Sequence, residues 1–245
     1  MKILALDIET TPLVTYTWGL WNQNIGINQI EEPSRVMCFA ARWLGEPKRS
    51  IRFFSEFHHG HEDMVEAAWE LVDEADALLT WNGISFDEKH LNREFLLADL
   101  GPPSPVFSID MMAQVKRRFR FDSNKLDWVS DQLRAGRKLN HAGFQLWLRC
   151  MAGDEKAWRE MQRYNEQDVH LLIEDFDRLS PWLRLPNQNL FEALGGCPTP
   201  GCTGTPVKQG FRRNQTGTFQ RYRCRECKRW STSGKSLERA ELRGE

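Results

Sequence analysis

Four acidic side chains stand where short apolar segments of the sequence end or pack. Asp7 and Glu9 close an apolar run, and because the side chains of a strand alternate in direction, both carboxylates can point to one side. Asp87 follows a turn, and Asp168 stands in a helical segment among apolar residues. Taken singly, these acids could be a solvated strand end, a helix N-cap and a surface charge. Together they offer the carboxylate oxygens that a hard divalent cation such as Mg2+ or Mn2+ prefers.

A tyrosine accompanies the last of these acids. Tyr164 and Asp168 are four residues apart in an expected helix, so the two side chains share one helical face. An unpaired carboxylate near a core is costly, which favours a ligand role for Asp168. A surface acid beside a core tyrosine is the simpler alternative.

Four of the six cysteines are concentrated in the last fifth of the chain. Cys197 and Cys202 are separated by four residues, and Cys224 and Cys227 by two, a pattern typical of a zinc site with four thiolate ligands. Residues 206–223 are typical of a β-hairpin. A segment this short buries too little core to fold unaided, so zinc would supply its folding energy. Two disulfides or free thiols are the alternatives.

Mixed strands and helices are expected to position these residues. Patterning and turn signals predict strands at 2–7, 35–44, 50–56 and 77–81, and helices at 61–77, 87–100, 109–119, 124–135, 143–150 and 153–177. Strands prevail early and helices later, which indicates an α/β domain with a central sheet. Cys38 and Cys150 fall on an apolar strand and an apolar helix, so we expect them to be core thiols.

Composition predicts where the domains begin and end. We expect residues 1–183 to form the α/β domain. Residues 184–196 are expected to be a linker, because Pro186 and the Gly195–Gly196 pair resist regular structure. Residues 197–231 then form the cysteine module, and residues 232–245 a flexible tail.

Length and composition exclude several classes of protein. The chain has 245 residues, of which 40% are apolar and 27% charged, so it can form a sizeable core. It contains no run of about 18 apolar residues, and acids interrupt its N-terminal apolar stretch. We therefore expect neither a membrane-spanning helix nor secretion, and expect the protein to be cytoplasmic.

The net charge of −1 conceals two oppositely charged parts. Residues 197–245 carry 11 Lys and Arg and 4 Asp and Glu, a net of +7, whereas residues 1–196 carry 22 and 30, a net of −8. Aromatic residues stand among the basic ones, so we expect the cysteine module to bind nucleic acid, with Arg221 and Arg223 among its contacts. A solvated surface, or a structural or protein-docking module, is the alternative.

Three short motifs follow one another across residues 3–177. They are Asp7-Ile8-Glu9, Asn82 to Asp87, and Tyr164 to Asp168, in that order. They resemble the DEDD superfamily of 3′–5′ exonucleases, the DnaQ-like branch of the ribonuclease-H-like fold. The third motif matches the tyrosine variant, because Arg163 stands where the histidine variant requires histidine. No polymerase domain accompanies the motifs, so we expect a stand-alone exonuclease of the kind that phages encode. The cysteine module resembles zinc ribbons of transposases and phage proteins.

The resemblance implies a fold and a role for each catalytic residue. The fold is a mixed central sheet flanked by helices. Asp7, Glu9 and Asp168 would hold a first Mg2+ or Mn2+, and Asp7 would help to hold a second. Asp87 would act at the second ion, partly through water, and Tyr164 would orient the attacking water.

Substrate contacts follow from the same resemblance and from residue type. The expected contacts in the α/β domain are Thr10, Leu13, Asn82 and Phe86. The first two lie just after the first motif, where family members contact the terminal nucleotide and its base. Trp18 and Trp21 stand in a polar stretch and would stack on single-stranded bases if exposed, or pack in a core or hairpin if buried.

We therefore expect an enzyme that hydrolyses nucleic acid from its 3′ end to nucleoside 5′-monophosphates, with two Mg2+ or Mn2+ ions and one structural Zn2+. Single-stranded DNA, or a frayed 3′ end, is the expected substrate. An exoribonuclease with the same acids is one alternative, since the choice of sugar depends on contacts to the 2′-hydroxyl. A non-catalytic nucleic-acid-binding adaptor is another, although a scaffold has no use for an intact set of acids.

Overall fold

The computed structural model describes residues 1–136, 143–190, 196–214 and 216–239. The chain separates into two compact units, a larger one at Lys2–Asp175 and a smaller one from Phe176 onwards. Within the described residues, no helix combines the length and the apolar character that crossing a bilayer requires.

The larger unit is built on a five-stranded sheet with the order β5-β4-β1-β6-β7. The central strand β1 (Ile3–Thr10) runs antiparallel to β4 (Val36–Trp43) and parallel to β6 (Ala77–Thr80). Outside these, β5 (Arg52–Ser55) pairs antiparallel with β4, and β7 (Phe107–Asp110) pairs parallel with β6. This mixed central sheet confirms the predicted fold class.

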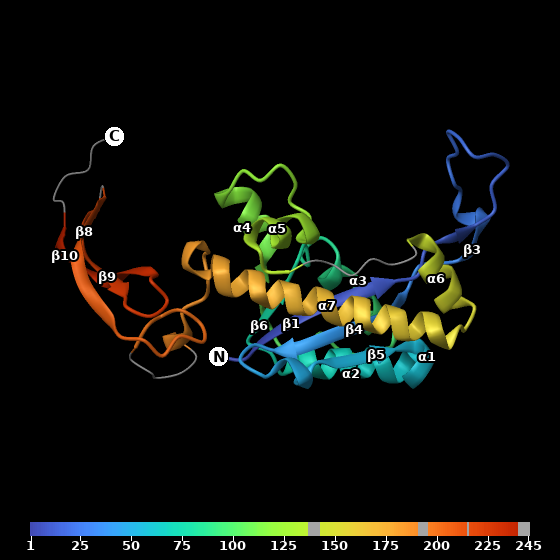
Figure 1. Ribbon diagram of the computed structural model, residues 1–245, viewed down its shortest axis with the longest axis horizontal. Helices are drawn as coiled ribbons and strands as arrows, with labels where there is room; N and C mark the ends of the chain where they lie inside the picture. Colours follow the sequence, from blue (N-terminus) through green and yellow to red (C-terminus); the bar gives the residue numbers. More distant parts are fainter. Residues whose placement is uncertain (137–142, 191–195, 215, 240–245) are drawn as a thin grey trace. The chain divides into compact units, whose positions relative to one another are not determined.

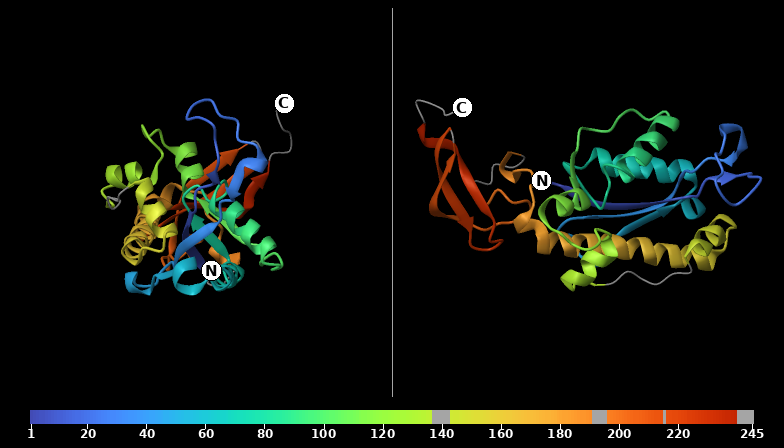
Figure 2. Two further views of the ribbon diagram at one scale, coloured as in Figure 1. Left: turned by 90° about the vertical axis from the view of Figure 1, so that its right-hand side faces the viewer. Right: turned by 90° about the horizontal axis from the view of Figure 1, so that it is seen from above.

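Helices cover both faces of this sheet (Figures 1 and 2). Buried side chains of α2 (His61–Asp73) and α3 (Asp87–Leu97) form one apolar cluster with β1 and β4. Those of α6 (Phe144–Met151) and α7 (Glu155–Leu179) form a second cluster on the opposite face of β4. The shorter helices are α1 (Glu56–His59), α4 (Met111–Arg118) and α5 (Leu126–Leu133).

The alternation of β1 decides which face of the sheet receives the acids. Leu4, Leu6 and Ile8 belong to the apolar cluster under α2 and α3. Because successive side chains point to opposite faces, Asp7 and Glu9 point to the face that α7 covers. Cys38 and Cys150 are buried on that same face, as predicted.

One strand of the sheet falls where a helix was predicted. We expected residues 109–119 to be helical, but Ile109 and Asp110 end β7, and α4 begins only at Met111. Ile109 is fully buried, and the Asp110 carboxylate accepts a hydrogen bond from the Ala113 N–H at 2.9 Å, which caps the helix. A four-residue strand is too short to show a period of two, so its pairing with β6 decided its conformation.

An exposed arm connects β1 to β4. Its base is the short pair β2 (Val14–Thr15) and β3 (Ile30–Glu32). Trp18 and Trp21 lie in the arm and are 99% and 81% exposed, so the interpretation of these residues as core or hairpin packing is wrong. Four 3-10 turns complete the described elements: Ile27–Gln29, Lys48–Ser50, Ser180–Trp182 and Gln188–Leu190.

The smaller unit carries a three-stranded antiparallel sheet. The predicted hairpin is present as β8 (Pro206–Asn214) and β9 (Gly217–Cys224). We predicted a flexible tail from residue 232, and this prediction is wrong up to Arg239. These residues belong to β10 (Trp230–Arg239), which pairs with β9. The side chains of β10 are mostly polar, and backbone hydrogen bonds hold the strand, so side-chain patterning gave no signal for it. Residues 240–245 lie outside the described part of the chain.

Candidate active site and cysteine cluster

Three of the four predicted acidic ligands converge in space. Ligand oxygens of Asp7, Glu9 and Asp168 all lie within 4.8 Å of one another. Asp7 and Glu9 come from β1, and Asp168 is 3% exposed on α7, which crosses the same face of the sheet. Carboxylates this close repel one another, and a divalent cation would offset the repulsion. The donor set therefore fits a hard cation such as Mg2+ or Mn2+.

Asp87 lies beside this cluster but is not part of it. The pairing of β1 with β6 ends at Ala5↔Leu79, so the Ile8 N–H needs another acceptor, and it donates to Asp87 Oδ1 at 3.2 Å. Asp87 is the first residue of α3, and Phe86 is the N-cap. The alternative that Asp87 is only a helix N-cap is therefore wrong.

The environment of Asp87 favours its neutral form. The carboxyl is 2% exposed, and burial, together with the negative charges of Asp110 and Glu88, raises its pKa to about 7. The hydrogen bond from Ile8 works against this shift. A nearby cation would lower the pKa and favour the carboxylate.

The turn before Asp87 is shaped by three residues. Asn82 has a φ of 74°, and its N–H donates to the Asp110 carboxylate at 3.2 Å. A Cβ atom at Gly83 would lie 2.1 Å from Thr80 Oγ1, so a close approach, and not a positive φ, requires glycine there. Asp110 therefore orders the second motif as well as capping α4.

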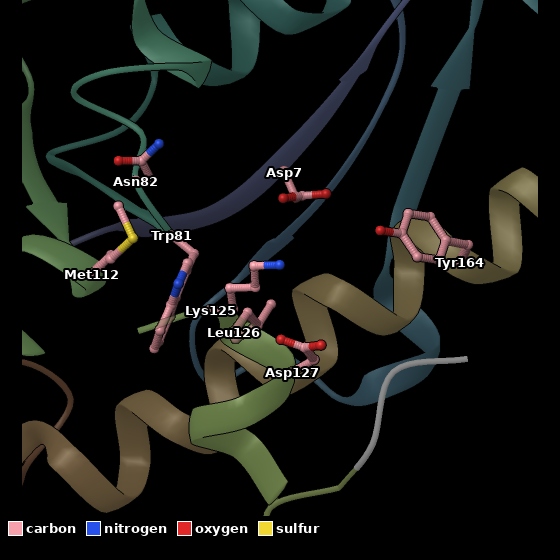
Figure 3. A pocket seen from close by; sticks show the side chains of 8 residues that line it. All are labelled: Asp7, Trp81, Asn82, Met112, Lys125, Leu126, Asp127 and Tyr164. Carbon is pink, nitrogen blue, oxygen red and sulfur yellow. The ribbon is translucent and has the colours of Figure 1, made fainter. Parts of the chain in front are cut away.

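A pocket of about 440 Å³ opens beside the acid cluster, within the size range of small-molecule clefts. Figure 3 shows the Tyr164 hydroxyl and the Lys125 ammonium group directed toward the space beside Asp7. Trp81 lies along another wall, where its Nε1 donates to the Asn124 carbonyl at 3.1 Å. The complete lining is Asp7, Trp81, Asn82, Met112, Lys125, Leu126, Asp127 and Tyr164.

Tyr164 joins the acids to a second, more apolar pocket. Its ring is 9% exposed and meets Trp147 edge to face, with centroids 6.1 Å apart. Trp147 lines a pocket of about 280 Å³ together with Thr10 and Phe144. Tyr164 and Thr10, both predicted from the sequence, therefore lie on adjoining surfaces.

The remaining predicted substrate contacts are less concentrated. Asn82 lines the pocket beside Asp7, whereas Phe86 lies outside its lining, 37% exposed and edge-on to His90 at 4.7 Å. Leu13 is 46% exposed at the root of the arm. The structure brings the three acids, Tyr164 and Asn82 to one site, whereas Phe86 and Leu13 do not line its pocket.

Sequence reasoning missed Asn165, which contacts the acid cluster directly. Its Nδ2 donates to Asp7 Oδ2 at 2.6 Å and to the Asp7 carbonyl at 3.1 Å. Its position three residues before Asp168 was a signal, because residues at that spacing share a helical face. Trp81 was missed although it directly precedes Asn82 of the second motif. Lys125 gave no such signal, since the segment between α4 and α5 reaches the site only through the tertiary fold.

The four cysteines of the smaller unit form the predicted cluster. Their sulfur atoms all lie within 4.8 Å of one another, with Cys197 Sγ 3.6 Å from Cys227 Sγ and Cys202 Sγ 3.7 Å from Cys224 Sγ. These separations are too long for disulfides, at about 2.05 Å. They match the edge of a tetrahedron with zinc–sulfur bonds of about 2.3 Å, which is about 3.8 Å. The set therefore fits one structural Zn2+.

Part of the expected linker belongs to this module. Gln188 is 5% exposed, and its Nε2 donates to the Cys197 carbonyl at 2.6 Å and to the Cys202 carbonyl at 2.8 Å. Its Oε1 accepts from the Gly201 N–H at 2.9 Å. The side chain thus satisfies three backbone groups of the first cysteine knuckle. Residues 191–195, which include the predicted Gly195, lie outside the described part of the chain.

Basic and aromatic side chains meet on the three-stranded sheet. The Arg221 guanidinium lies 4.3 Å from the centroid of Trp230, and that of Arg223 lies 5.4 Å from it. Trp230 pairs with Arg223 across β10 and β9. A stacked cationic and aromatic surface of this kind offers both phosphate and base contacts.

Comparison with known proteins agrees with the fold. A family model described as the RNase H superfamily matches residues 4–179. Among solved structures, the family B DNA polymerase from the hyperthermophilic archaeon Pyrobaculum calidifontis is similar over 74% of this chain, with a TM-score of 0.55 and 16% identity. This chain spans only 24% of the length of that polymerase, and at this identity the likeness concerns the fold alone. No curated protein matches the sequence.

Proposed function

Because the chain belongs to the RNase H superfamily, we propose that it is a metal-dependent nuclease, and specifically a 3′–5′ exonuclease of single-stranded DNA. The observation that carries this proposal is the convergence of Asp7, Glu9 and Asp168 within 4.8 Å beside a pocket. The order of the three motifs supports the exonuclease assignment. Released nucleoside 5′-monophosphates would be the products.

Each acid has a distinct part in the proposed site. Asp7, Glu9 and Asp168 would hold one divalent ion, and Asp7 would help to hold a second. The two ions would supply an activated water and neutralise charge on the phosphate and the leaving oxygen. Asp87 would act at the second ion through a water molecule. Its Oδ1 accepts from Ile8, so its other oxygen would serve this role.

Tyr164 and Lys125 both line the pocket beside Asp7. We assign to the Tyr164 hydroxyl the orientation of the attacking water by a hydrogen bond. The Lys125 ammonium group would bind a phosphate oxygen of the substrate and so limit repulsion between the strand and the acids. Both groups come from elements that the fold, and not their place in the sequence, brings to β1.

The cysteine module is proposed to be a zinc ribbon that retains the substrate. Cys197, Cys202, Cys224 and Cys227 would hold Zn2+ and stabilise the three-stranded sheet. Arg221 and Arg223 would contact phosphates, and Trp230 would stack on a base. On the arm, the exposed Trp18 and Trp21 would offer further stacking surfaces.

Incubation with end-labelled oligomers tests the proposal. Single-stranded DNA and RNA, labelled at either end, are incubated with Mg2+, Mn2+ or EDTA. We expect a ladder of shortened 5′-labelled DNA, immediate release of a mononucleotide from 3′-labelled DNA, and no reaction in EDTA. Preferential RNA shortening would make the protein an exoribonuclease, and binding without hydrolysis under every condition would make it an adaptor.

A further inference from the structure

We propose that Asn165 is a positioning residue of the acidic metal site, and that it holds Asp7 in the orientation in which its carboxylate can bind the ions. This inference rests on the proposed metal site. Asn165 would contact neither substrate nor ion and would act through Asp7 alone. No role for this residue follows from the three sequence motifs.

The side-chain amide of Asn165 makes two hydrogen bonds to Asp7, and we call this pair of bonds the clamp. Asn165 Nδ2 donates to the Asp7 side-chain Oδ2 at 2.6 Å and to the Asp7 main-chain carbonyl at 3.1 Å. One amide group therefore ties the side chain of Asp7 to its own backbone, which leaves its torsion angles little freedom. The two residues are 158 positions apart in the sequence, so the clamp also fixes α7 against β1 at this point.

Asparagine at position 165 can position Asp7, but it stabilises the fold less than an apolar residue would. Asn165 is fully buried, and its Oδ1 has no hydrogen-bond partner among the residues that the structure describes, which is costly. Asparagine is also a poorer helix former than alanine or leucine. An apolar residue would therefore stabilise the middle of α7 more, whereas only a residue with an N–H donor can hold the Asp7 carboxylate.

The neutrality of the amide matters as well. A lysine or arginine at this position would neutralise Asp7 and compete with a divalent cation for its oxygens. An amide donor orients the carboxylate without cancelling its charge. Of the carboxylate oxygens of Asp7, the amide donates to Oδ2, and a carboxylate has about four lone-pair sites, so a single amide hydrogen bond does not saturate it. Outer groups of this kind commonly tune a metal site by about 10- to 100-fold in affinity.

Mn2+ binding to the zinc-loaded, full-length protein tests the inference without relying on turnover. Unbound Mn2+ is counted by electron paramagnetic resonance for wild type, Asn165→Ala and Asn165→Leu, with Asp7→Asn as the variant that lacks the ligand charge. We expect both Asn165 variants to bind Mn2+ about 10- to 100-fold more weakly. In the oligomer assay, their half-saturating Mg2+ concentration should rise, while the rate at saturating Mg2+ recovers most of the wild-type value.

Ser130→Ala is the matched control. Ser130 is also fully buried, and its Oγ lies within hydrogen-bond distance of Asp175 at 2.7 Å and of the Leu126 carbonyl at 2.8 Å, neither of which belongs to the acid cluster. Its loss should lower the melting temperature and leave Mn2+ affinity unchanged. Should Asn165→Ala fail to fold, Asn165→Leu fills the space and still lacks the donor.

The outcomes separate this inference from the proposed function. Wild-type Mn2+ affinity in a folded Asn165 variant would overturn the clamp. Wild-type protein that binds Mn2+ but cleaves no oligomer would overturn the nuclease proposal, while the comparison of affinities would still decide the role of Asn165. Wild-type protein that binds no Mn2+ would overturn both.

Discussion

Asp7, Glu9 and Asp168 bring three carboxylates within 4.8 Å of one another, and one of them is almost completely buried. Such an arrangement costs free energy until a cation neutralises it. The Tyr164 phenol and the Lys125 ammonium group line the pocket beside Asp7, and the Asn165 amide donates to its carboxylate. At this scale the site favours ion binding over stability, as functional sites commonly do.

Replacing Asp168 by asparagine should weaken ion binding without lowering the stability of the fold. The substitution removes one negative charge at constant shape, so hydrolysis should fall to background while DNA binding is retained. In EDTA the variant should melt at or above the wild-type temperature, because repulsion is relieved. Mg2+ should raise the melting temperature of wild type only.

Glu166→Gln is the control for this prediction. Glu166 lies on the same helix, where it accepts from Gln162 at 2.8 Å, outside the acid cluster. It should keep both wild-type activity and the shift in melting temperature with Mg2+. Turnover by Asp168→Asn at the wild-type rate would contradict the assignment of the metal site.

Tyr164→Phe should slow hydrolysis without changing the affinity for the divalent ions. Phenylalanine keeps the ring against Trp147 and removes only the hydroxyl that faces the pocket. A hydrogen bond to a charged group is worth about 1.5–3 kcal/mol, so kcat should fall about 10- to 100-fold. Single-turnover kinetics, with Mn2+ affinity measured in parallel, checks this. An unchanged kcat would remove the hydroxyl from the reaction.

At the scale of elements, α3 is tied to the sheet and to α2 by one buried carboxylate. Glu94 is 3% exposed and accepts from the Val36 N–H at 3.0 Å, from Arg93 at 2.6 Å and, within 3.3 Å, contacts the His61 ring. Burial alone would raise the pKa of Glu94, but the hydrogen bonds from His61, Arg93 and Val36 outweigh it and lower the pKa to about 2. This connection holds the helix that begins at Asp87.

Glu94→Gln should therefore destabilise the larger unit in a pH-dependent way. The pKa of Glu94 is lower in the folded than in the unfolded chain, so its ionised form stabilises the fold at every pH above about 4.5, its ordinary value. This contribution is lost as the pH falls from about 4.5 toward 2. Urea denaturation at several pH values should show a deficit of about 1–3 kcal/mol at pH 7 that shrinks with acidification.

The exposed Glu70 of α2 offers a matched change of charge without buried hydrogen bonds. Glu70→Gln should leave the free energy of unfolding within about 0.5 kcal/mol of wild type. A deficit for Glu94→Gln that stays constant down to pH 2 would show that folding does not lower the pKa of Glu94.

At the scale of the whole molecule, the two units differ in charge as they differ in structure. Residues 197–245 carry a net charge of +7, and residues 1–196 a net of −8. The acidic part contains the proposed reaction site, so its charge repels a polyanion. We infer that a basic, zinc-stabilised module on the same chain offsets this repulsion by raising the local concentration of substrate.

Removing two arginines from this module should weaken binding and reduce its dependence on salt. Each phosphate contact to a single strand contributes about 0.7 to the slope of log K against log salt. Arg221→Ala combined with Arg223→Ala should therefore lower the slope by about 1.4, with an unchanged zinc content, as measured by fluorescence anisotropy. Arg159→Ala, in an exposed pair with Glu155, should leave the slope unchanged. Equal slopes for all proteins would make the module a bystander in DNA binding.

Short-range patterns made much of this protein predictable from its sequence. The alternation along β1, the helical spacing of Tyr164 and Asp168, and the cysteine spacings depend only on neighbouring residues and backbone geometry. They were sufficient for the mixed α/β class and for the grouping of the four thiolates. The acid set was predicted from the resemblance of three motifs to a known family, and three of its four members meet in the structure. The hairpin of the module was predictable for the same reason.

Contacts between distant segments could not be read in this way. Asp87 binds the Ile8 N–H because β6 stops pairing with β1 at Ala5, and Asn165 reaches Asp7 only because α7 crosses that face of the sheet. The strand β10 is held by backbone hydrogen bonds, which do not depend on the types of its side chains. The sequence alone therefore determined which residue types are available for chemistry, and the tertiary structure decided which of them meet, because residue spacing constrains only near neighbours whereas packing joins segments far apart along the chain.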